Sequence, residues 1–86
     1  MMFWRDYRQD VAKNVSEGAL FERKHPHNLI ETARVLSIAN DQFGIPHVKY
    51  EVKFERAQER GRRFEGPRVL ALSVFADNYR RCAEAG

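Results

Sequence analysis

Residues 48–56 carry the clearest alternation of apolar and charged side chains in the chain. Apolar side chains stand at every second position, at Val48, Tyr50, Val52 and Phe54, and lysine or glutamate fills the positions between them. A period of two places the two sets on opposite faces of a β-strand. The pattern therefore predicts a half-buried strand whose buried face is aromatic and β-branched.

Two segments ahead of this strand have apolar residues at helical spacing. In residues 3–15 they recur every four positions, which is typical of an amphipathic helix. In residues 29–43 they again fall on one arc. Asn28 and Glu31 stand where a capping box begins a helix, and Gly44 stands where a helix ends. The sequence therefore predicts two helices, and the second has both a start signal and a stop signal.

The segment after the strand is ambiguous. Residues 57–66 are charged and contain two glycines, which is typical of a loop. Residues 68–75 are apolar in every helical direction, although Pro67 before them is a favourable first residue of a helix. Because a lone strand leaves its backbone groups unpaired, we predict that residues 68–75 form a strand antiparallel to residues 48–56. Asp77 then predicts the start of a short final helix.

Together these elements predict one α+β domain over residues 1–86, with the order α-α-β-β-α and an antiparallel β-hairpin packed on helices. A chain of 86 residues fits a single domain. A two-stranded sheet is thin for independent stability. The sequence therefore also suggests a homodimer that joins two hairpins into a four-stranded sheet.

The composition predicts a cytoplasmic protein with a mixed-charge surface. The hydrophobic content is 43%, and fifteen basic residues outnumber twelve acidic ones for a net charge of +3. A single cysteine, Cys82, cannot form an internal disulfide, which favours a reducing compartment. No apolar run approaches the roughly 20 residues of a membrane span, and the first residues lack the layout of a signal peptide. We therefore expect no membrane partner.

The strongest candidate binding site is a group of basic side chains on and around the predicted hairpin loop. Its members are Arg56, Arg60, Arg62, Arg63, Arg68, Lys49 and Lys53. Such a cluster is suited to phosphate contacts. The alternative is a solvated loop, because Glu55, Glu59 and Glu65 interleave with the cations and mixed sign weakens the electrostatic field. Arg80 and Arg81 either extend the patch or offset a helix dipole.

Other candidate chemistry has little support in the sequence. His25, His27, His47 and Cys82 match no standard spacing of zinc ligands. Cys82 lacks the local signature of a nucleophile, and the glycines lack the spacing of a phosphate-binding loop. We therefore expect no cofactor, no metal and no catalytic residue.

One short segment resembles a known family. Residues 43–52 read Phe-Gly-Ile-Pro-His-Val-Lys-Tyr-Glu-Val and follow a predicted helix. They are similar to the start of double-stranded RNA-binding domains, which place a Gly-x-Pro loop and a Tyr-Glu strand after a helix in an α-β-β-β-α order. The resemblance implies recognition of RNA shape and phosphates. The chain departs from that pattern because it shows no third strand and lacks the lysine-rich start of the final helix.

These observations favour a non-enzymatic small binding protein, a regulator or inhibitor that acts through protein–protein contacts. Compact proteins of this kind are common in mobile genetic elements. Another protein is the expected partner. The alternative function is a nucleic-acid-binding module that uses the Arg-rich hairpin loop.

Overall fold

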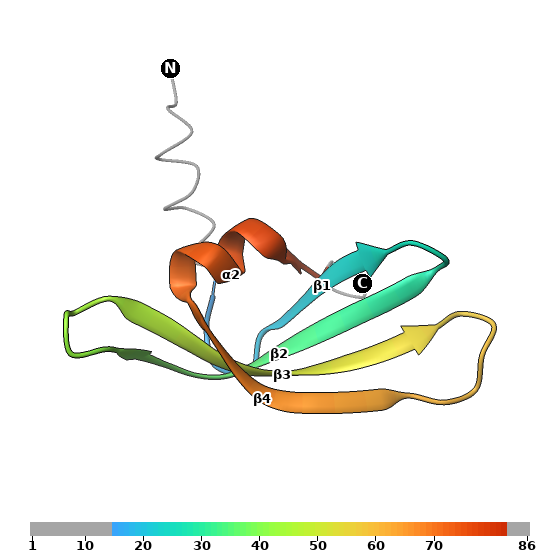
Figure 1. Ribbon diagram of the computed structural model, residues 1–86, viewed down its shortest axis with the longest axis horizontal. Coiled ribbons are helices and arrows are strands. Elements are labelled where there is room, and N and C mark those ends of the chain that lie inside the picture. The colour runs from blue at the N-terminus through green and yellow to red at the C-terminus, as the bar shows by residue number, and fades with distance from the viewer. Residues whose placement is uncertain (1–14, 83–86) are drawn as a thin grey trace, which may run out of the picture.

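The computed structural model describes residues 15–82 of the chain. They form an antiparallel sheet with the strand order β4-β3-β2-β1-β5 and a short helix over one face (Figure 1). The elements in chain order are β1 (Leu20–His25), β2 (Leu29–Asn40), β3 (Pro46–Arg56), β4 (Arg63–Ala71), α2 (Leu72–Asn78) and β5 (Arg80–Arg81). The predicted α-α-β-β-α arrangement is therefore wrong, because the described part of the chain is mostly antiparallel sheet.

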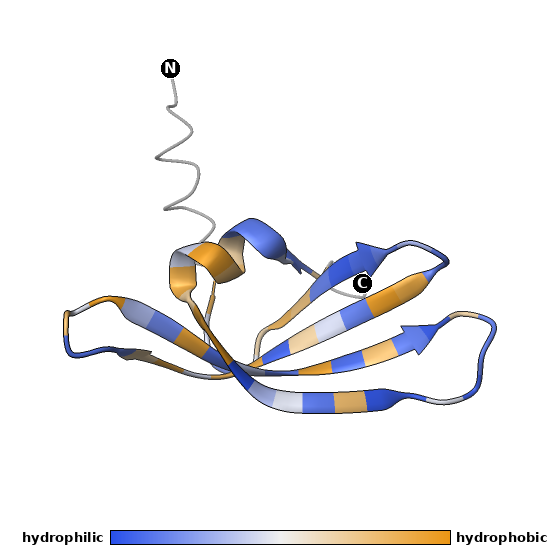
Figure 2. Ribbon diagram, viewed as in Figure 1, coloured by the Kyte–Doolittle hydropathy of each residue, from blue (hydrophilic) through white to orange (hydrophobic). Residues whose placement is uncertain are grey.

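The strand predicted from the alternating pattern is confirmed as β3. Val48, Tyr50 and Val52 are buried on the face that α2 covers, which we call the inner face. The charged residues between them lie on the opposite, outer face. The alternation of polar and apolar segments is visible along the strands in Figure 2.

The predicted helix over residues 29–43 is wrong, because residues 29–40 form β2 in the middle of the sheet. β2 pairs with β1 on one side and with β3 on the other. Its buried residues are Glu31, Ala33 and Val35, which also have a period of two. Glu31 interrupts the apolar alternation, so the helical arc formed by other residues of the segment was the more visible signal.

The signals that predicted the ends of this helix instead belong to hairpin turns. His27 and Asn28 both have positive φ angles, of 63° and 61°, and form the turn between β1 and β2. Gly44 has a φ of 78° in the turn between β2 and β3. There the Asp41 carboxylate accepts hydrogen bonds from the backbone N–H groups of Phe43 and Ile45. Asparagine and glycine tolerate left-handed backbone in turns as well as at helix ends, so their presence alone does not separate the two structures.

The prediction for residues 68–75 is half right. Residues 63–71 form β4, which pairs antiparallel with β3 across the Arg-rich loop as expected. The chain then enters α2, so the last four residues of the predicted strand are helical. Asp77 lies near the end of α2 rather than at the start of a helix, and the chain returns to the sheet as β5 beside β1.

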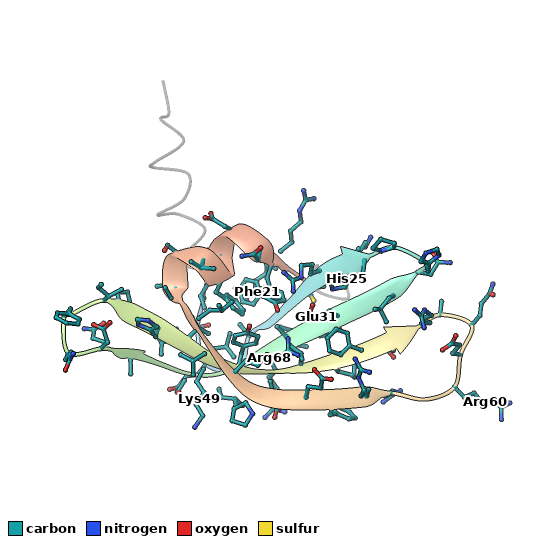
Figure 3. All side chains as sticks on the ribbon, viewed as in Figure 1. Phe21, His25, Glu31, Lys49, Arg60 and Arg68 are labelled. Atoms are coloured by element: carbon teal, nitrogen blue, oxygen red, sulfur yellow. The ribbon has the colours of Figure 1, made fainter. Side chains whose placement is uncertain are left out.

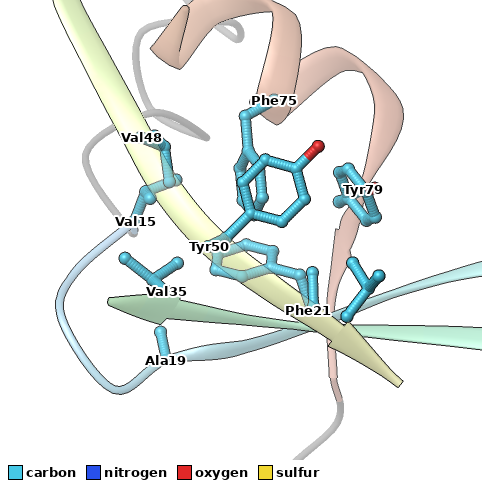
Figure 4. Packing of buried hydrophobic residues seen from close by; sticks show 10 residues of the cluster. Val15, Ala19, Phe21, Val35, Val48, Tyr50, Phe75 and Tyr79 are labelled. Atoms are coloured by element: carbon cyan, nitrogen blue, oxygen red, sulfur yellow. The ribbon is translucent and has the colours of Figure 1, made fainter. Parts of the chain in front are cut away.

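The core lies between α2 and the inner face and combines four aromatic rings with valines and alanines of the sheet (Figure 4). The Phe75 ring centroid lies 5.1 Å from those of Phe21 and Tyr50, both edge-on, and 4.7 Å from that of Tyr79, which stacks on it. Among the rings of residues 15–82, Phe75 is the one that contacts rings from β1, from β3 and from the segment that leads into β5. The helical turn places this ring in the core, which explains why a continuous strand to residue 75 does not form.

The predicted first helix, residues 3–15, lies outside the described residues except for Val15, which joins the core. A homodimer is not needed to complete the sheet, because one chain supplies all five strands that the described residues form. Within residues 15–82 no helix has the length and apolar character needed to cross a membrane.

Gly66 is expected to tolerate no side chain. Its φ is 134°, and a Cβ atom there would lie 3.0 Å from the Glu51 Cα atom in the neighbouring strand. We expect Gly66→Ala to lower the free energy of unfolding by about 2–3 kcal/mol, measured by urea denaturation. Gly61→Ala is the matched control, because Gly61 has a φ of 126° but no atom within 4 Å of the added Cβ. Equal losses in both variants would contradict a role for the close approach to Glu51.

Candidate functional site

The structure divides the predicted basic cluster between the two faces of the sheet. Lys49 and Lys53 lie on the outer face, because they alternate with the buried residues of β3. Arg63 and Arg68 lie on the inner face, where their guanidinium carbons are 5.2 and 5.9 Å from the centroid of the Phe54 ring. These four residues therefore cannot grip one ligand from the same side of the sheet.

The remaining arginines lie at the end of the β3–β4 hairpin. Arg56 ends β3, and Arg60 and Arg62 belong to the loop of residues 57–62. Figure 3 shows Arg60 projecting from the tip of this loop and Lys49 near the other end of the hairpin. We call residues 55–63 the hairpin end.

Glutamates neutralise most of the predicted cations. The ion pairs are Arg56 with Glu59 at 3.7 Å, Arg62 with Glu55 at 3.7 Å, Arg63 with Glu65 at 3.1 Å, Lys53 with Glu55 at 3.3 Å, and Arg68 with Glu65. Within the described residues, Arg60 and Lys49 form no ion pair. Charges of alternating sign a few ångströms apart largely cancel at longer range, so the hairpin end projects only a weak positive field.

Two shallow grooves flank the hairpin end, one on each side of the hairpin loop. One has a volume of about 370 Å³ and includes Leu29 and Phe54 in its lining, together with several loop residues. The other, of about 450 Å³, includes Ile30 from the opposite face of β2. Glu55, Arg56, Glu59, Arg60, Gly61 and Arg62 line both. Charged loop residues thus line the same grooves as half-buried apolar side chains from the start of β2.

The outer face of β4 exposes two large apolar side chains. Phe64 is 68% exposed and Val69 is 59% exposed. Phe64 stands opposite Lys53, and Val69 stands opposite Lys49. Aromatic side chains and arginines are both enriched in protein interfaces, and this end of the sheet exposes both types.

A buried carboxylate network lies on the inner face, and the sequence analysis did not identify it. Glu31 has no exposed surface. Its Oε1 accepts hydrogen bonds from the Arg23 guanidinium, at 3.0 and 3.2 Å, and pairs with His25 Nε2 at 2.8 Å. The Tyr79 hydroxyl donates to Oε2. The available signal was an acidic residue at an inward position of an alternating segment, but it required β2 to be recognised as a strand.

The network holds Glu31 in its ionised form. Burial raises the pKa of the Glu31 carboxyl, but the hydrogen bonds from Tyr79, His25 and Arg23 and the Arg23 charge outweigh it, so its pKa falls below 4.5. Burial and the bond to Glu31 raise the pKa of the Tyr79 hydroxyl, which stays protonated. The group ties β1, β2 and the segment before β5 together and is structural in character.

The side chains that the sequence analysis considered for metal binding or nucleophilic chemistry, three histidines and Cys82, do not form a site in the described part of the chain. Residues 15–82 contain no group of three histidine, cysteine or acidic side chains arranged to hold a metal ion. His25 is bound to Glu31, and His47 Nδ1 lies 2.9 Å from the carbonyl oxygen of Ile45. Burial raises the pKa of the Cys82 thiol, which disfavours the thiolate that a nucleophile needs.

Comparison of the chain with protein families, curated proteins and solved structures finds no match. The segment that resembles double-stranded RNA-binding domains, residues 43–52, lies in the turn between β2 and β3 and the first part of β3. It follows a strand rather than a helix, so its structural context differs from the one that the resemblance implies.

Proposed function

We propose that this chain is a non-enzymatic protein-binding module, a regulator or inhibitor that acts through the hairpin end and the adjoining surface of β4. The observation that carries the proposal is the pairing of the hairpin-end arginines with glutamates, next to a strand that exposes Phe64 on its outer face. A surface of alternating charge is complementary to another protein surface of alternating charge. It is poorly suited to a polyanion, because the glutamates repel successive phosphates.

A second candidate function is nucleic-acid binding. Arg60 is free of ion pairs within the described residues, and arginines beside the Phe54 ring are the side-chain types that contact phosphates and bases in single strands. This candidate predicts an affinity that depends steeply on salt, since each phosphate contact releases counterions.

Titration of a labelled single strand and a labelled duplex at about 50 and 200 mM salt separates the two functions. We expect no measurable binding at either salt concentration. An affinity that falls by a factor of about 10³ over this range would support the nucleic-acid function and overturn the proposal.

The protein partner is tested with a variant of the hairpin end. A protein captured on the immobilised chain is purified and titrated by calorimetry against wild type and against Arg62→Glu/Arg63→Glu. We expect a sub-micromolar affinity that the double variant weakens by about 100-fold or more, because each arginine becomes a like charge beside Glu55 or Glu65. Lys24→Glu is the control, because Lys24 is exposed on β1, which β2 and β3 separate from β4, and it is expected to change the affinity less than about twofold. Equal binding by all three chains would place the interface elsewhere and contradict the proposal.

A further inference from the structure

The groove on the inner side of the hairpin loop has a half-buried apolar floor and a charged wall. The floor is formed by Leu29 at the start of β2 and Phe54 near the end of β3. The wall is formed by the loop, with Arg60, Gly61 and Arg62. With a volume of about 370 Å³, the groove is large enough for one or two amino-acid side chains.

Some of the arginines that line this groove have a carboxylate partner, and one does not. Arg56 pairs with Glu59, and Arg62 pairs with Glu55, so these two arginines have carboxylates at 3.7 Å already. Arg60 lines the same groove and has no ion pair within residues 15–82. The groove thus combines an apolar floor with one arginine, at the tip of the loop, that no carboxylate of the described residues neutralises.

A guanidinium presents parallel N–H donors that match the two oxygens of a carboxylate. A single uncompensated arginine matches a single anionic side chain, whereas a nucleic-acid strand would bring several phosphates against Glu55 and Glu59, which line the groove too. An apolar residue beside the anionic one would cover the floor and exclude water from the ion pair, which strengthens it.

We propose that this groove binds an acidic–apolar segment of the protein partner, with an aspartate or glutamate on Arg60 and a neighbouring apolar side chain against Leu29 and Phe54. The inference rests on the proposed function and specifies the chemistry of the partner. It makes Arg60 the specificity-determining residue of the hairpin end, in contrast to the paired arginines around it.

The test is an NMR titration of the ¹⁵N-labelled full chain with the blocked peptide acetyl-Gly-Phe-Glu-Gly-amide and its glutamine counterpart. We expect the glutamate peptide to shift the amide signals of residues 57–62 and of Leu29, and to bind about tenfold more tightly than the glutamine peptide. Arg60→Glu should abolish these shifts. Lys49→Glu makes the same charge change at another exposed cation without an ion pair in the described region, and should leave the affinity within about twofold.

Inorganic phosphate and oligothymidylate are titrated under the same conditions. Tighter binding of either than of the glutamate peptide would assign the groove to a nucleic-acid phosphate and overturn the inference. Equal affinity for the glutamate and glutamine peptides would overturn it as well. If the purified partner still binds wild type and discriminates against Arg62→Glu/Arg63→Glu while the peptide causes no shifts, the inference alone fails. If the partner binds wild type and Arg62→Glu/Arg63→Glu equally well, the proposed function itself is contradicted.

Discussion

Phe75→Ala is expected to lower the free energy of unfolding by about 3–5 kcal/mol. Phe75 is fully buried, and its ring contacts those of Phe21, Tyr50 and Tyr79. Removing it leaves a cavity where α2 meets the sheet and removes ring contacts that add to the effect of burial. A domain of this size is ordinarily stable by about 5–10 kcal/mol, so the variant should lose a large part of its total stability.

The measurement is urea denaturation followed by the fluorescence of the aromatic residues. Val74→Ala is the matched control on the same helix, because Val74 is 42% exposed and lies outside the core cluster, and a loss below about 1 kcal/mol is expected. Phe75→Leu keeps most of the volume, and we expect a loss of about 1–2 kcal/mol, which gives a folded sample if the alanine variant does not fold. Similar losses for Val74→Ala and Phe75→Ala would show that α2 is not anchored by this ring.

Glu31→Ala is expected to lower the free energy of unfolding by about 3 kcal/mol at pH 7. The change removes the carboxylate that accepts a hydrogen bond from the buried Tyr79 hydroxyl and that Arg23 and His25 share. A buried polar group that loses its partner costs about 1–3 kcal/mol, and Arg23 adds less because it is partly solvated. Glu51→Ala is the control, since Glu51 forms an exposed pair with Arg34 at 3.9 Å and should cost less than about 1 kcal/mol.

Wild type and Glu31→Ala should also differ in how their free energy of unfolding depends on pH. The pKa of Glu31 is lower in the folded state than its ordinary value of 4.5, so the unfolded state binds more protons over the interval between the two values. The contribution of Glu31 to stability is therefore complete above about pH 4.5 and is lost as the pH falls through the lower, folded-state pKa. Urea denaturation across this range should show the gap between wild type and Glu31→Ala narrowing on acidification. A gap that stays constant down to pH 2 would contradict an ionised, hydrogen-bonded Glu31.

The candidate binding surface was predicted in part. The sequence placed arginines and glutamates together in a loop between two antiparallel strands, and the structure contains that loop. It did not show that the cations divide between two faces, nor which of them pair. Those properties depend on the register of β4 against β3, which shifts between Tyr50 and Val52. A shift of one residue moves every later side chain of a strand to the other face, so register is decided by pairing rather than by composition.

By itself, the sequence determined those features that depend on neighbouring residues. The strict alternation of residues 48–56 specified β3 and its buried face, whereas Asn28 and Gly44, which predicted the ends of a helix, lie in hairpin turns. Only the tertiary structure decided the state of residues 29–40. Glu31 is tolerable inside a sheet because Tyr79, 48 residues away in sequence, and Arg23 on the adjacent strand satisfy its carboxylate. No local pattern contains that information, because the cost of burying a charge is offset by partners that only the folded chain brings together.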